Sequence, residues 1–502
     1  MESSSYLILV HDCKFKLLKI VTTSPMVLGC STQKLVFLLR RLAVRSLRPP
    51  HCSFNVPSPA LLLAILVLSP TVLPAKLGDL ELAPTDQTVF GTVNTEESAF
   101  LAQLEVASAQ RACHLLNSTL PNLVSFPGSP QFEADNEHWN VESEEVSTCS
   151  IEPETPEDVA RIVRGGGHAY NVGFSSTCGV QISMVRFTSI QYDASSNTVT
   201  LGTGTNWDSV YAELEPLGFL GGGFNWKTNQ VGLTIDTVVA LEIVLPSGEL
   251  AHVTNTKNAD LFFALKGGLN GFGVVTSITY EAQPQTEVFA GEVVWDQNFS
   301  DLNKALETFD LTNTDPKAQV ILSYYYLLGQ RFAILTFCAS IRIALHDVPI
   351  LKYTVPVLEE MQAQVISVGD SLSAQINEST VFVAWSAQPF TNPFAHSRGG
   401  AYPHPPSRQV TPAMPFVAVQ ASAGSKVRPA LLRAVKETCR KVQERAVQEG
   451  QSRWDDLLYP NYALADTPLE LMYGKNVERL AEIAKKFDPK GVMRLTGGFK
   501  FQ

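Results

Sequence analysis

Residues 164–168 read Arg164-Gly165-Gly166-Gly167-His168, a glycine run that ends directly at a histidine. Glycine carries no Cβ, so the main-chain N–H groups of such a run can close on a phosphate. The histidine is then held beside whatever the loop binds. An ordinary glycine-rich turn followed by a surface or core histidine would look the same. The stretch therefore indicates a phosphate-bearing ligand only where other parts of the chain support it.

This run belongs to one of several diagnostic stretches along the chain. They are Ser147-Thr148-Cys149, RGGGHAYNVGFSS from Arg164, GGGFNWKTNQVGLTIDTV from Gly221, DLFFALKGGLNGFGVVT from Asp260, and YPNYALADTPLE from Tyr459 with the closing GGFKF. In this order they resemble the FAD-linked oxidases of the berberine-bridge-enzyme type, a branch of the vanillyl-alcohol-oxidase superfamily with a PCMH-type FAD-binding domain. The resemblance runs from about Cys113 to Phe501 and is weakest in the middle third.

The resemblance implies an α+β fold. A two-part PCMH-type FAD-binding domain would combine an N-terminal portion with a C-terminal segment that returns to it, and an α+β substrate domain built on an antiparallel sheet would be inserted between them. The expected ranges are 1–76 for a leader, 105–285 for the FAD-binding domain, 286–450 for the substrate domain and 451–502 for the berberine-bridge-like C-terminal segment. Strands and helices also mix without regular βαβ alternation, which independently favours α+β.

Periodicity and turn signals predict individual elements. Thr155 has the position of an N-cap for a helix that Pro156 opens. The turn Pro246-Ser247-Gly248-Glu249 joins two strands into a hairpin. A Gly/Pro-rich loop at 397–403 could border a binding cleft. Other expected helices are 207–214, 258–265, 299–309, 355–365 and 427–448, and expected strands are 180–184, 198–202, 237–245, 250–254, 272–280, 319–326 and 331–337.

The cofactor that the resemblance implies is FAD, attached covalently through the imidazole of His168. Neutral imidazole is a nucleophile at ambient pH, and the attachment would raise the redox potential of the flavin. The backbone of Gly165, Gly166 and Gly167 would bind the diphosphate. Further cofactor contacts are implied for Gly222, Gly223, Asn229, Gln230, Asp236, Gly267, Gly268 and Tyr462. Without the resemblance, these stretches also fit glycine-rich turns that join helices to strands.

The motif at Tyr459 resembles the family segment that faces the flavin ring. A tyrosine can act as a general base toward an alcohol if its surroundings lower its pKa. Tyr459 is therefore the candidate catalytic base, and Asn461 would orient it by a hydrogen bond. Two alternatives stay open: the tyrosines could anchor the C-terminal tail on the core, or the base could come from Tyr324–Tyr326 or Tyr402.

Bulk composition limits the class of protein. The chain has 502 residues, of which 45% are hydrophobic and 17% charged, which excludes a disordered chain. Its formal net charge of −11 argues against nucleic-acid binding, because a phosphate backbone requires clustered Lys and Arg. We expect a small-molecule substrate and O2 as partners, no nucleic acid and no membrane span, and the oligomeric state stays open. No spacing typical of zinc ligands occurs, so no metal site is expected.

The first 76 residues have the character of a leader. A basic stretch precedes the apolar run 60–68, which is too short to span a bilayer but has the length of a signal-peptide core. Its distance from Met1 leaves two interpretations, an uncleaved or transit-like leader or an upstream extension that the mature protein lacks. We expect a secreted glycoprotein with acceptor sequons at Asn117, Asn298 and Asn377. The resemblance also implies a disulfide that joins Cys113 to Cys149, the alternative being two buried thiols.

The chain departs from the family pattern at two places beside the expected cofactor. The helix that begins near Thr155 runs directly into Arg164, where the family has a further loop and a strand. Residues 215–219 lead at once to Gly221, where the family has a longer loop. Two functions therefore compete. One is a secreted FAD-dependent oxidoreductase that oxidises an alcohol, sugar or secondary metabolite by hydride transfer to flavin, with O2 as acceptor. The other is a non-catalytic or flavin-poor relative disabled by the missing segments.

Overall fold

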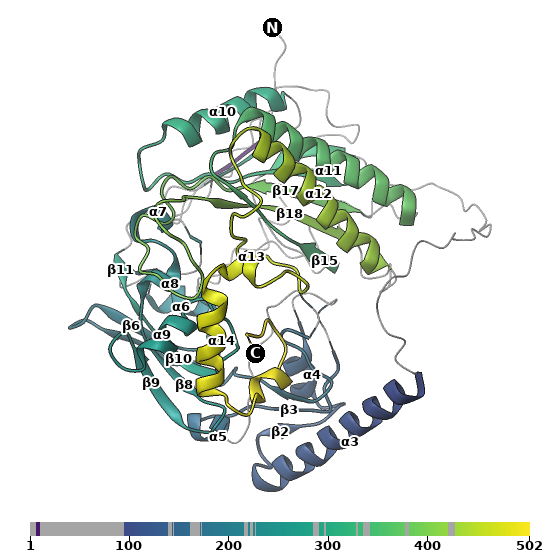
Figure 1. Cartoon of the computed structure of the whole chain (residues 1–502), viewed down its shortest axis with the longest axis vertical. Coiled ribbons are helices and arrows are strands. Elements are labelled where there is room, and N and C mark those ends of the chain that lie inside the picture. The colour runs from purple at the N-terminus through teal and green to yellow at the C-terminus, as the bar shows by residue number, and fades with distance from the viewer. Residues whose placement is uncertain are drawn as a thin grey trace, which may run out of the picture.

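Helices and antiparallel sheets are mixed in this structure, which confirms the predicted α+β class (Figure 1). Figure 1 shows helices covering one face of an upper sheet, with a second sheet and smaller elements below. The computed structural model describes residues 7–10, 95–138, 143, 145–160, 171, 173–214, 219–220, 224–225, 227–284, 291–295, 298–327, 330–334, 342–376, 381–419 and 427–501.

A five-stranded antiparallel sheet of order β5-β6-β10-β8-β9 forms the centre of the lower half. Its strands are β5 (Ile190–Asp193), β6 (Thr198–Gly202), β8 (Val238–Val244), β9 (Leu250–Thr254) and β10 (Val274–Glu281). The helices beside it are α6 (Trp207–Leu214), α7 (Thr228–Val231), α8 (Thr234–Thr237) and α9 (Ala259–Leu265). β8 and β9 make the predicted hairpin, in which Val244 pairs with Leu250 across the turn.

The N-terminal part of this half is a small sheet of order β2-β3-β4, in which β3 and β4 run parallel. Its elements are α3 (Thr95–Thr119), β2 (Val124–Ser125), α4 (Pro130–Asn136), β3 (Cys149–Ile151), α5 (Pro156–Ala160) and β4 (Val180–Ile182). A disulfide joins Cys113 of α3 to Cys149 of β3, as predicted. The Asp158 N–H donates to Thr155 Oγ1 over 3.2 Å, which confirms the N-cap of α5.

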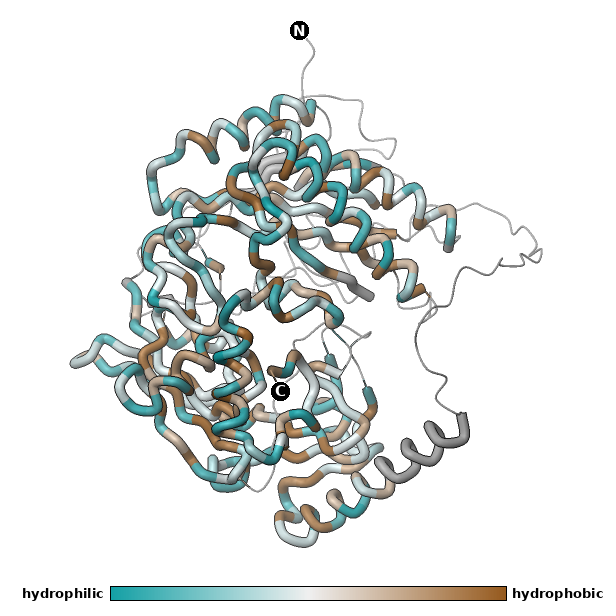
Figure 2. Tube along the Cα trace, viewed as in Figure 1, coloured by the Kyte–Doolittle hydropathy of each residue, from teal (hydrophilic) through white to brown (hydrophobic). Residues whose placement is uncertain are grey.

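The upper half contains a sheet of order β14-β13-β17-β18-β15, and β16 also pairs with β18. Its elements are α10 (Phe299–Thr312), β13 (Leu322–Leu327), β14 (Gln330–Ile334), β15 (Arg342–Leu345), β16 (Val348–Ile350), α11 (Val355–Ile376), β17 (Phe382–Ala387), β18 (Thr411–Val419) and α12 (Arg428–Gln448). Trp385 of β17 is fully buried, and its Nε1 donates to Thr438 Oγ1 of α12 over 2.8 Å. The helices alternate brown and teal in Figure 2, as amphipathic helices do.

The C-terminal segment packs into the core of the lower half. It comprises α13 (Glu470–Tyr473), α14 (Asn476–Phe487) and a 3₁₀ turn, η5 (Val492–Leu495). Phe501 stacks on Phe272 at 5.8 Å between ring centroids, and Tyr473 contacts the Phe501 ring edge-on at 4.9 Å. Short pairings complete the topology: β1 (Leu7–Val10) with β12 (Gly291–Val294), and β7 (Phe219–Leu220) with β11 (Gln283–Pro284).

A buried polar junction ties the lower half to the loop 397–404. The side chains of Asp236 in α8 and His404 are both 0% exposed, and His404 Nε2 lies 2.9 Å from Asp236 Oδ1. The same oxygen accepts the Arg398 N–H over 2.7 Å, while Oδ2 accepts the Leu233 N–H over 3.0 Å. His404 Nδ1 lies 2.7 Å from the Tyr402 carbonyl, which can only accept, so this nitrogen carries a proton. Each polar atom of the pair is therefore partnered.

Several predicted boundaries differ from those observed. The predicted helix 355–365 continues to Ile376, and Val368 and Leu372 of its later part are buried in the hydrophobic core of the upper half. The predicted strand 319–326 begins only at Leu322. The strands β15, β16, β17 and β18 were not among the expected elements. The domain boundaries themselves stay predictions, although every strand of the upper sheet lies within the range 286–450.

Among the helices that the structure describes, none combines the length and apolar character needed to cross a bilayer. Within the same residues, no group of three His, Cys, Asp or Glu side chains is arranged to hold a metal ion.

The disulfide is expected to stabilise the lower half. It closes a loop with a sequence separation of 36, so its loss should reduce the free energy of unfolding by about 2–4 kcal/mol. Cys113→Ser and Cys149→Ser should behave alike in urea denaturation, whereas Cys178→Ser, which replaces an exposed free thiol, should match the wild type. Equal stability of all three variants would contradict this role.

The junction predicts a second stability effect. His404→Ala would leave the fully buried Asp236 carboxylate without its imidazole, which should lower the free energy of unfolding by about 3–5 kcal/mol. His252→Ala is the matched control, because that imidazole is exposed and lies 3.6 Å from Glu242, so a change of less than about 0.5 kcal/mol is expected. Urea denaturation followed by tryptophan fluorescence measures both. A loss below about 1 kcal/mol for His404→Ala would show that the junction contributes little.

Candidate functional site

Part of the predicted site lies outside the residues that the structure describes. These residues are Gly165, Gly166, Gly167, His168, Gly222, Gly223 and the sequon residue Asn377. The other two sequon residues are described: Asn117 lies within α3, and Asn298 directly precedes α10. Flavin attachment, phosphate binding and glycosylation at these positions stay predictions.

The predicted catalytic residues meet in one tight turn, residues 459–462. The Tyr462 N–H donates to the Tyr459 carbonyl oxygen over 2.9 Å, which closes the turn around Pro460 and Asn461. Asn461 Nδ2 donates to the Tyr459 hydroxyl oxygen over 2.7 Å. This is the contact expected of a residue that orients the phenol. The structure therefore brings Tyr459 and Asn461 together, while their catalytic roles stay predictions.

Electrostatics limit what the Tyr459 phenol can do. Burial raises the pKa of Tyr459 well above its usual value of 10.0, and the neighbouring Tyr462 raises it further. The hydrogen bond from Asn461 acts in the opposite direction, because a donor to the oxygen favours phenolate. At neutral pH the phenol is protonated and can donate a hydrogen bond. It can take a proton from a substrate only after it has ionised.

Tyr462 has a partner that sequence reasoning missed. Gln388, directly after β17, is 8% exposed and hydrogen-bonds the Tyr462 side chain. Burial raises the pKa of Tyr462, and this hydrogen bond lowers it. The available signal was a polar residue at the end of the apolar run that forms β17, but nothing in the sequence linked it to a turn more than seventy residues later.

Aromatic rings connect this turn to the second predicted flavin stretch. Phe224 contacts the Tyr459 ring edge-on at 5.1 Å between centroids, and Tyr402 does so at 5.9 Å. Tyr402 in turn stacks on His404 at 5.8 Å with ring planes only 8° apart. The stretch that begins at Gly221, the loop 397–403 and the C-terminal motif therefore converge on one cluster of rings.

The two polar residues of α7 occupy different environments. Asn229 is buried, and its Oδ1 accepts the Asn392 N–H over 3.1 Å. Its Nδ2 is buried without a hydrogen-bond partner among the described residues. Gln230 is half-buried one position later. A cofactor contact by either residue stays a prediction, and so does one by Asp236, whose oxygens are occupied by Leu233, Arg398 and His404.

Gly267 and Gly268 make close approaches to the protein itself. Gly267 has φ +101°, and a Cβ there would come within 3.1 Å of Tyr402 Cβ. A Cβ on Gly268 would lie 2.2 Å from the Ala264 carbonyl oxygen. The absence of side chains thus lets the loop 397–403 settle on the end of α9. The Ala401 N–H also donates to the Lys266 carbonyl over 2.9 Å, so the loop packs on this end of α9, and a cleft beside the loop stays a prediction.

A shallow hollow that opens to solvent lies between α6 and the strands β6 and β10. Apolar side chains from these elements form one wall, while Gly232 and Thr234 of the second predicted flavin stretch form another. Lys227 also lines it, and burial lowers the pKa of that lysine, with Lys317 lowering it further. No residue of the 459–462 turn reaches the hollow.

Two buried donors fit a cofactor rich in acceptor atoms. The first is Asn229 Nδ2, which has no protein partner in the described part of the chain. The second is Lys266, a residue only 4% exposed, whose amino group lies 5.7 Å from the centroid of the Phe262 ring and makes no ion pair with the described residues. Burial lowers the pKa of Lys266, while the charge of Asp236 raises it. Oxygens and ring nitrogens of FAD could accept from such groups, so the residues present fit this cofactor.

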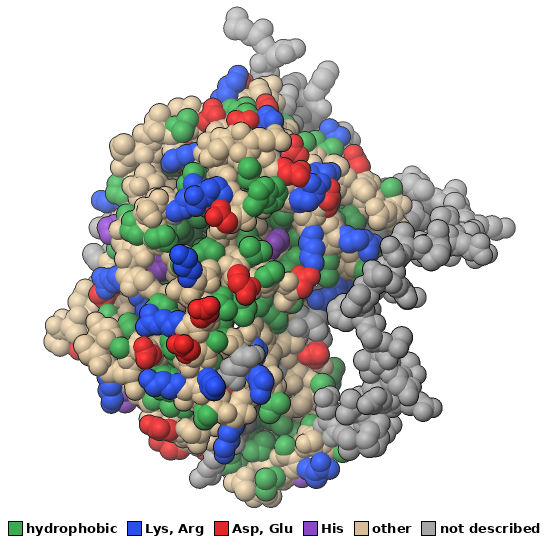
Figure 3. Space-filling view, viewed as in Figure 1, with side chains coloured by type: hydrophobic (Ala, Val, Ile, Leu, Met, Phe, Trp, Pro, Cys, Tyr) green, Lys and Arg blue, Asp and Glu red, His purple; other side chains and the backbone are tan. Residues whose placement is uncertain are grey.

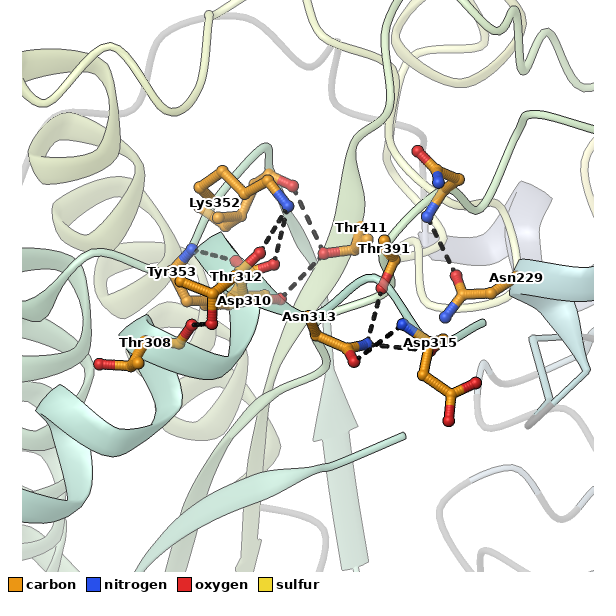
Figure 4. A network of polar contacts seen from close by, with 12 residues as sticks. Asn229, Thr308, Asp310, Thr312, Asn313, Asp315, Lys352, Tyr353, Thr391 and Thr411 are labelled. Atoms are coloured by element: carbon orange, nitrogen blue, oxygen red, sulfur yellow. Dashed lines mark hydrogen bonds and ion pairs between the residues drawn. The ribbon is translucent and has the colours of Figure 1, made fainter. Parts of the chain in front are cut away.

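Polar contacts at the edge of the upper sheet anchor the segment that Asn229 reaches (Figure 4). Asn313 Nδ2 donates to Thr391 Oγ1 over 3.1 Å. The next residue, Asn392, donates its backbone N–H to Asn229 Oδ1. Nearby, Asp310 of α10 accepts from Lys352 Nζ over 3.0 Å and from the Tyr353 N–H over 2.7 Å. These bonds fix the start of α11 against α10.

Charges of both signs are interspersed over the face shown in Figure 3, with hydrophobic side chains between them. Many form local pairs, such as Arg440 with Glu437 at 2.9 Å along α12. Such exposed pairs contribute little to stability. This face therefore carries no single-sign field that would steer a charged macromolecule.

Two segments match models of known families. Residues 151–254 match an FAD-binding domain, and residues 458–498 match a family described as berberine and berberine like. The first segment contains the hairpin and α7–α8, and the second contains the whole 459–462 turn and α14. The matches therefore cover both regions that the aromatic cluster brings together.

Curated relatives are fungal flavoproteins. The chain is 33% identical over 230 residues to FAD-dependent monooxygenase drtC of Aspergillus calidoustus, which covers 39% of this chain and 44% of the relative. It is 34% identical over 218 residues to FAD-dependent monooxygenase macF of Penicillium terrestre, covering 37% and 42%. The matched region thus spans less than half the length of these relatives.

Solved structures share the fold over most of the chain. The wild-type BBE-like 1 protein of Physcomitrella patens superimposes with a TM-score of 0.58 at 16% identity, covering 77% of this chain and 97% of that one. A chitooligosaccharide oxidase gives a TM-score of 0.58 at 15% identity, covering 78% and 98%. The chain therefore contains an FAD-binding segment and a C-terminal segment that is similar to berberine bridge enzyme, and it shares the fold of these solved proteins.

Proposed function

We propose that this chain is a secreted oxidoreductase that uses FAD to oxidise an alcohol, a sugar or a secondary metabolite, with O2 as the final electron acceptor. The observation that carries the proposal is the convergence of the 459–462 turn with Phe224 and Tyr402. In that cluster the hydrogen-bonded Asn461–Tyr459 pair stands beside the second predicted flavin stretch. Bound FAD would supply a two-electron acceptor for the hydride of the substrate.

The residues of the turn would handle the proton. An alcohol that loses a hydride also loses its hydroxyl proton, and Tyr459 can take that proton only as phenolate. The hydrogen bond from Asn461 favours phenolate, so it would assist this transfer. Gln388 would do the same for Tyr462. The rings of Phe224 and Tyr402 would keep water away from the reacting atoms.

The class of substrate rests on the relatives. The curated relatives are named monooxygenases of filamentous fungi, and the solved ones include oxidases of chitooligosaccharides and glucooligosaccharides. The glucooligosaccharide oxidase of Acremonium strictum is described as carrying a histidyl FAD. By analogy, we place His168 as the attachment point in this chain. Secretion rests on the apolar run 60–68 and the sequons.

A non-catalytic relative is the second candidate. The observation that favours it is the strongly raised pKa of Tyr459, which leaves this phenol unable to act as a base at neutral pH without further help. The occupied oxygens of Asp236 and the packed Gly267 also point to structural use of residues expected at the cofactor.

A visible spectrum of the purified protein separates the two candidates. We expect a flavin spectrum, and after acid precipitation a yellow pellet, because covalent FAD stays with the denatured chain. His168→Ala should release or lose the colour, whereas His252→Ala, which changes an exposed histidine of β9, should keep it. Oxygen consumption with candidate alcohols and oligosaccharides then follows. A colourless wild-type protein with normal circular dichroism would overturn the enzyme proposal in favour of the non-catalytic relative.

A further inference from the structure

Two consecutive residues between β15 and β16, His346 and Asp347, hold both ends of the 459–462 turn. Asp347 Oδ2 accepts the Tyr459 N–H over 2.9 Å. The His346 imidazole hydrogen-bonds the backbone of Tyr462, and that bond favours the protonated ring, so the imidazole donates to the carbonyl oxygen. His346 Nδ1 is buried without a hydrogen-bond partner among the described residues.

Each of these two side chains leaves one buried polar atom without a hydrogen-bond partner among the described residues. Asp347 is 2% exposed, and its Oδ1, like His346 Nδ1, is buried with no hydrogen-bond partner in the described part of the chain. An unsatisfied buried oxygen costs free energy that a smaller apolar residue would not. His346 and Asp347 are therefore less favourable for stability than apolar residues would be at these positions. Their bonds to the backbone instead fix the position of the 459–462 turn.

The charge of Asp347 also acts on the phenols around it. Its carboxylate raises the pKa values of Tyr353, Tyr402, Tyr459 and Tyr462, in each case after the larger effect of burial. The Cys439 thiol of α12 is affected in the same way. The ionisation state of Asp347 therefore influences every phenol that faces the turn.

We propose that His346 and Asp347 are positioning residues that clamp the 459–462 turn and thereby set where the phenols of Tyr459 and Tyr462 point. This inference rests on the proposed function, in which these phenols serve a reaction. Neither clamp residue needs to touch substrate or cofactor. The backbone bonds fix the turn from two sides, and Asn461 and Gln388 then act on phenols whose places are already set.

Hydrogen exchange over residues 458–464 tests the Asp347 arm. Asp347→Ala removes the acceptor of the Tyr459 amide, so exchange there should accelerate about tenfold, the factor that corresponds to one net hydrogen bond. Asp347→Asn keeps an oxygen acceptor and should restore slow exchange. Asp488→Ala is the matched control, because Asp488 is equally buried and accepts two amides near η5, so only residues 491–494 should loosen. If residues 458–464 of Asp347→Ala exchanged at the wild-type rate, the proposed clamp would be overturned.

The His346 arm has its own pair of variants. His346→Gln can present an N–H to the Tyr462 backbone, so it should keep the Tyr462 end of the turn protected from exchange, whereas His346→Ala should not.

Ultraviolet titration of the tyrosines tests the charge of Asp347, because a purely structural role of this residue would leave the titration unchanged. Asp347→Asn should shift ionisation of the phenols to lower pH, because it removes a negative charge beside them. An unchanged titration would contradict the electrostatic part of the proposal.

These outcomes are independent of flavin. A colourless wild-type protein in which Asp347→Ala still loosens the turn would overturn the proposed function and leave the clamp in place as a structural device. A flavin-bearing wild type in which neither alanine variant alters exchange would overturn the clamp and leave the proposed function intact.

The clamp also predicts a pH dependence of stability. Burial raises the pKa of Asp347 from 3.8 to about 7 in the folded protein. Between those values the unfolded chain has lost the proton that the folded chain keeps, so wild-type stability falls as pH rises through this window. Asp347→Asn lacks this penalty, so the ratio of the two unfolding constants should change by up to about tenfold per pH unit in favour of the variant.

Comparing these two proteins isolates Asp347 from its neighbour. Burial lowers the pKa of His346 from its ordinary value of 6.5 to about 4. This residue therefore acts in the opposite direction, because its titration lowers the stability of the protein as pH falls from 6.5 towards 4. Both proteins contain His346, and its contribution cancels in the ratio. Urea denaturation at several pH values measures the effect, and a pH-independent ratio would show that Asp347 does not titrate within the window.

Discussion

The carboxylate of Asp236 has no access to water, and the arrangement of the loop beside it follows from that constraint. A buried charge is tolerated only when its oxygens are bonded. Leu233, Arg398 and His404 supply those bonds, and they come from two segments that lie far apart in the chain. Because all three are needed, the loop 397–404 cannot leave α8 without exposing an unpaired charge to the core.

The position of that loop decides the surroundings of the 459–462 turn. His404 stacks on Tyr402, and Tyr402 contacts the Tyr459 ring, so the buried junction reaches the turn through aromatic contacts. Gly267 permits this approach because a side chain there would strike Tyr402. Phenols enclosed in this way lose solvation of their charged form and stay protonated. Their chemistry then depends on a few donors, Asn461 and Gln388, and on the negative charge of Asp347.

Local features of the fold were predictable because their determinants are neighbours in the sequence. The hairpin of β8 and β9 follows from β-branched strands around a Pro-Ser-Gly turn, and α5 follows from its Thr155 cap. The pair Tyr459 and Asn461 was identified through the resemblance of the motif at Tyr459, and the hydrogen bond between them is local because both lie in one turn. The strands β15 to β18 were missed because their pairing partners are distant, and α11 was cut short because its later turns are stabilised by packing rather than by a sequence signal.

The sequence by itself determined the α+β class, the FAD-related stretches, the disulfide partners implied by resemblance and the residues of the C-terminal turn. Each depends on motifs, composition or residues that are close together in the chain. Only the tertiary structure decided that Asp236 binds His404, that Gln388 reaches Tyr462, and that Asp347 holds Tyr459 across a separation of 112 residues. Those contacts join polar residues that carry no signal of one another, because their pairing is set by how the two halves pack.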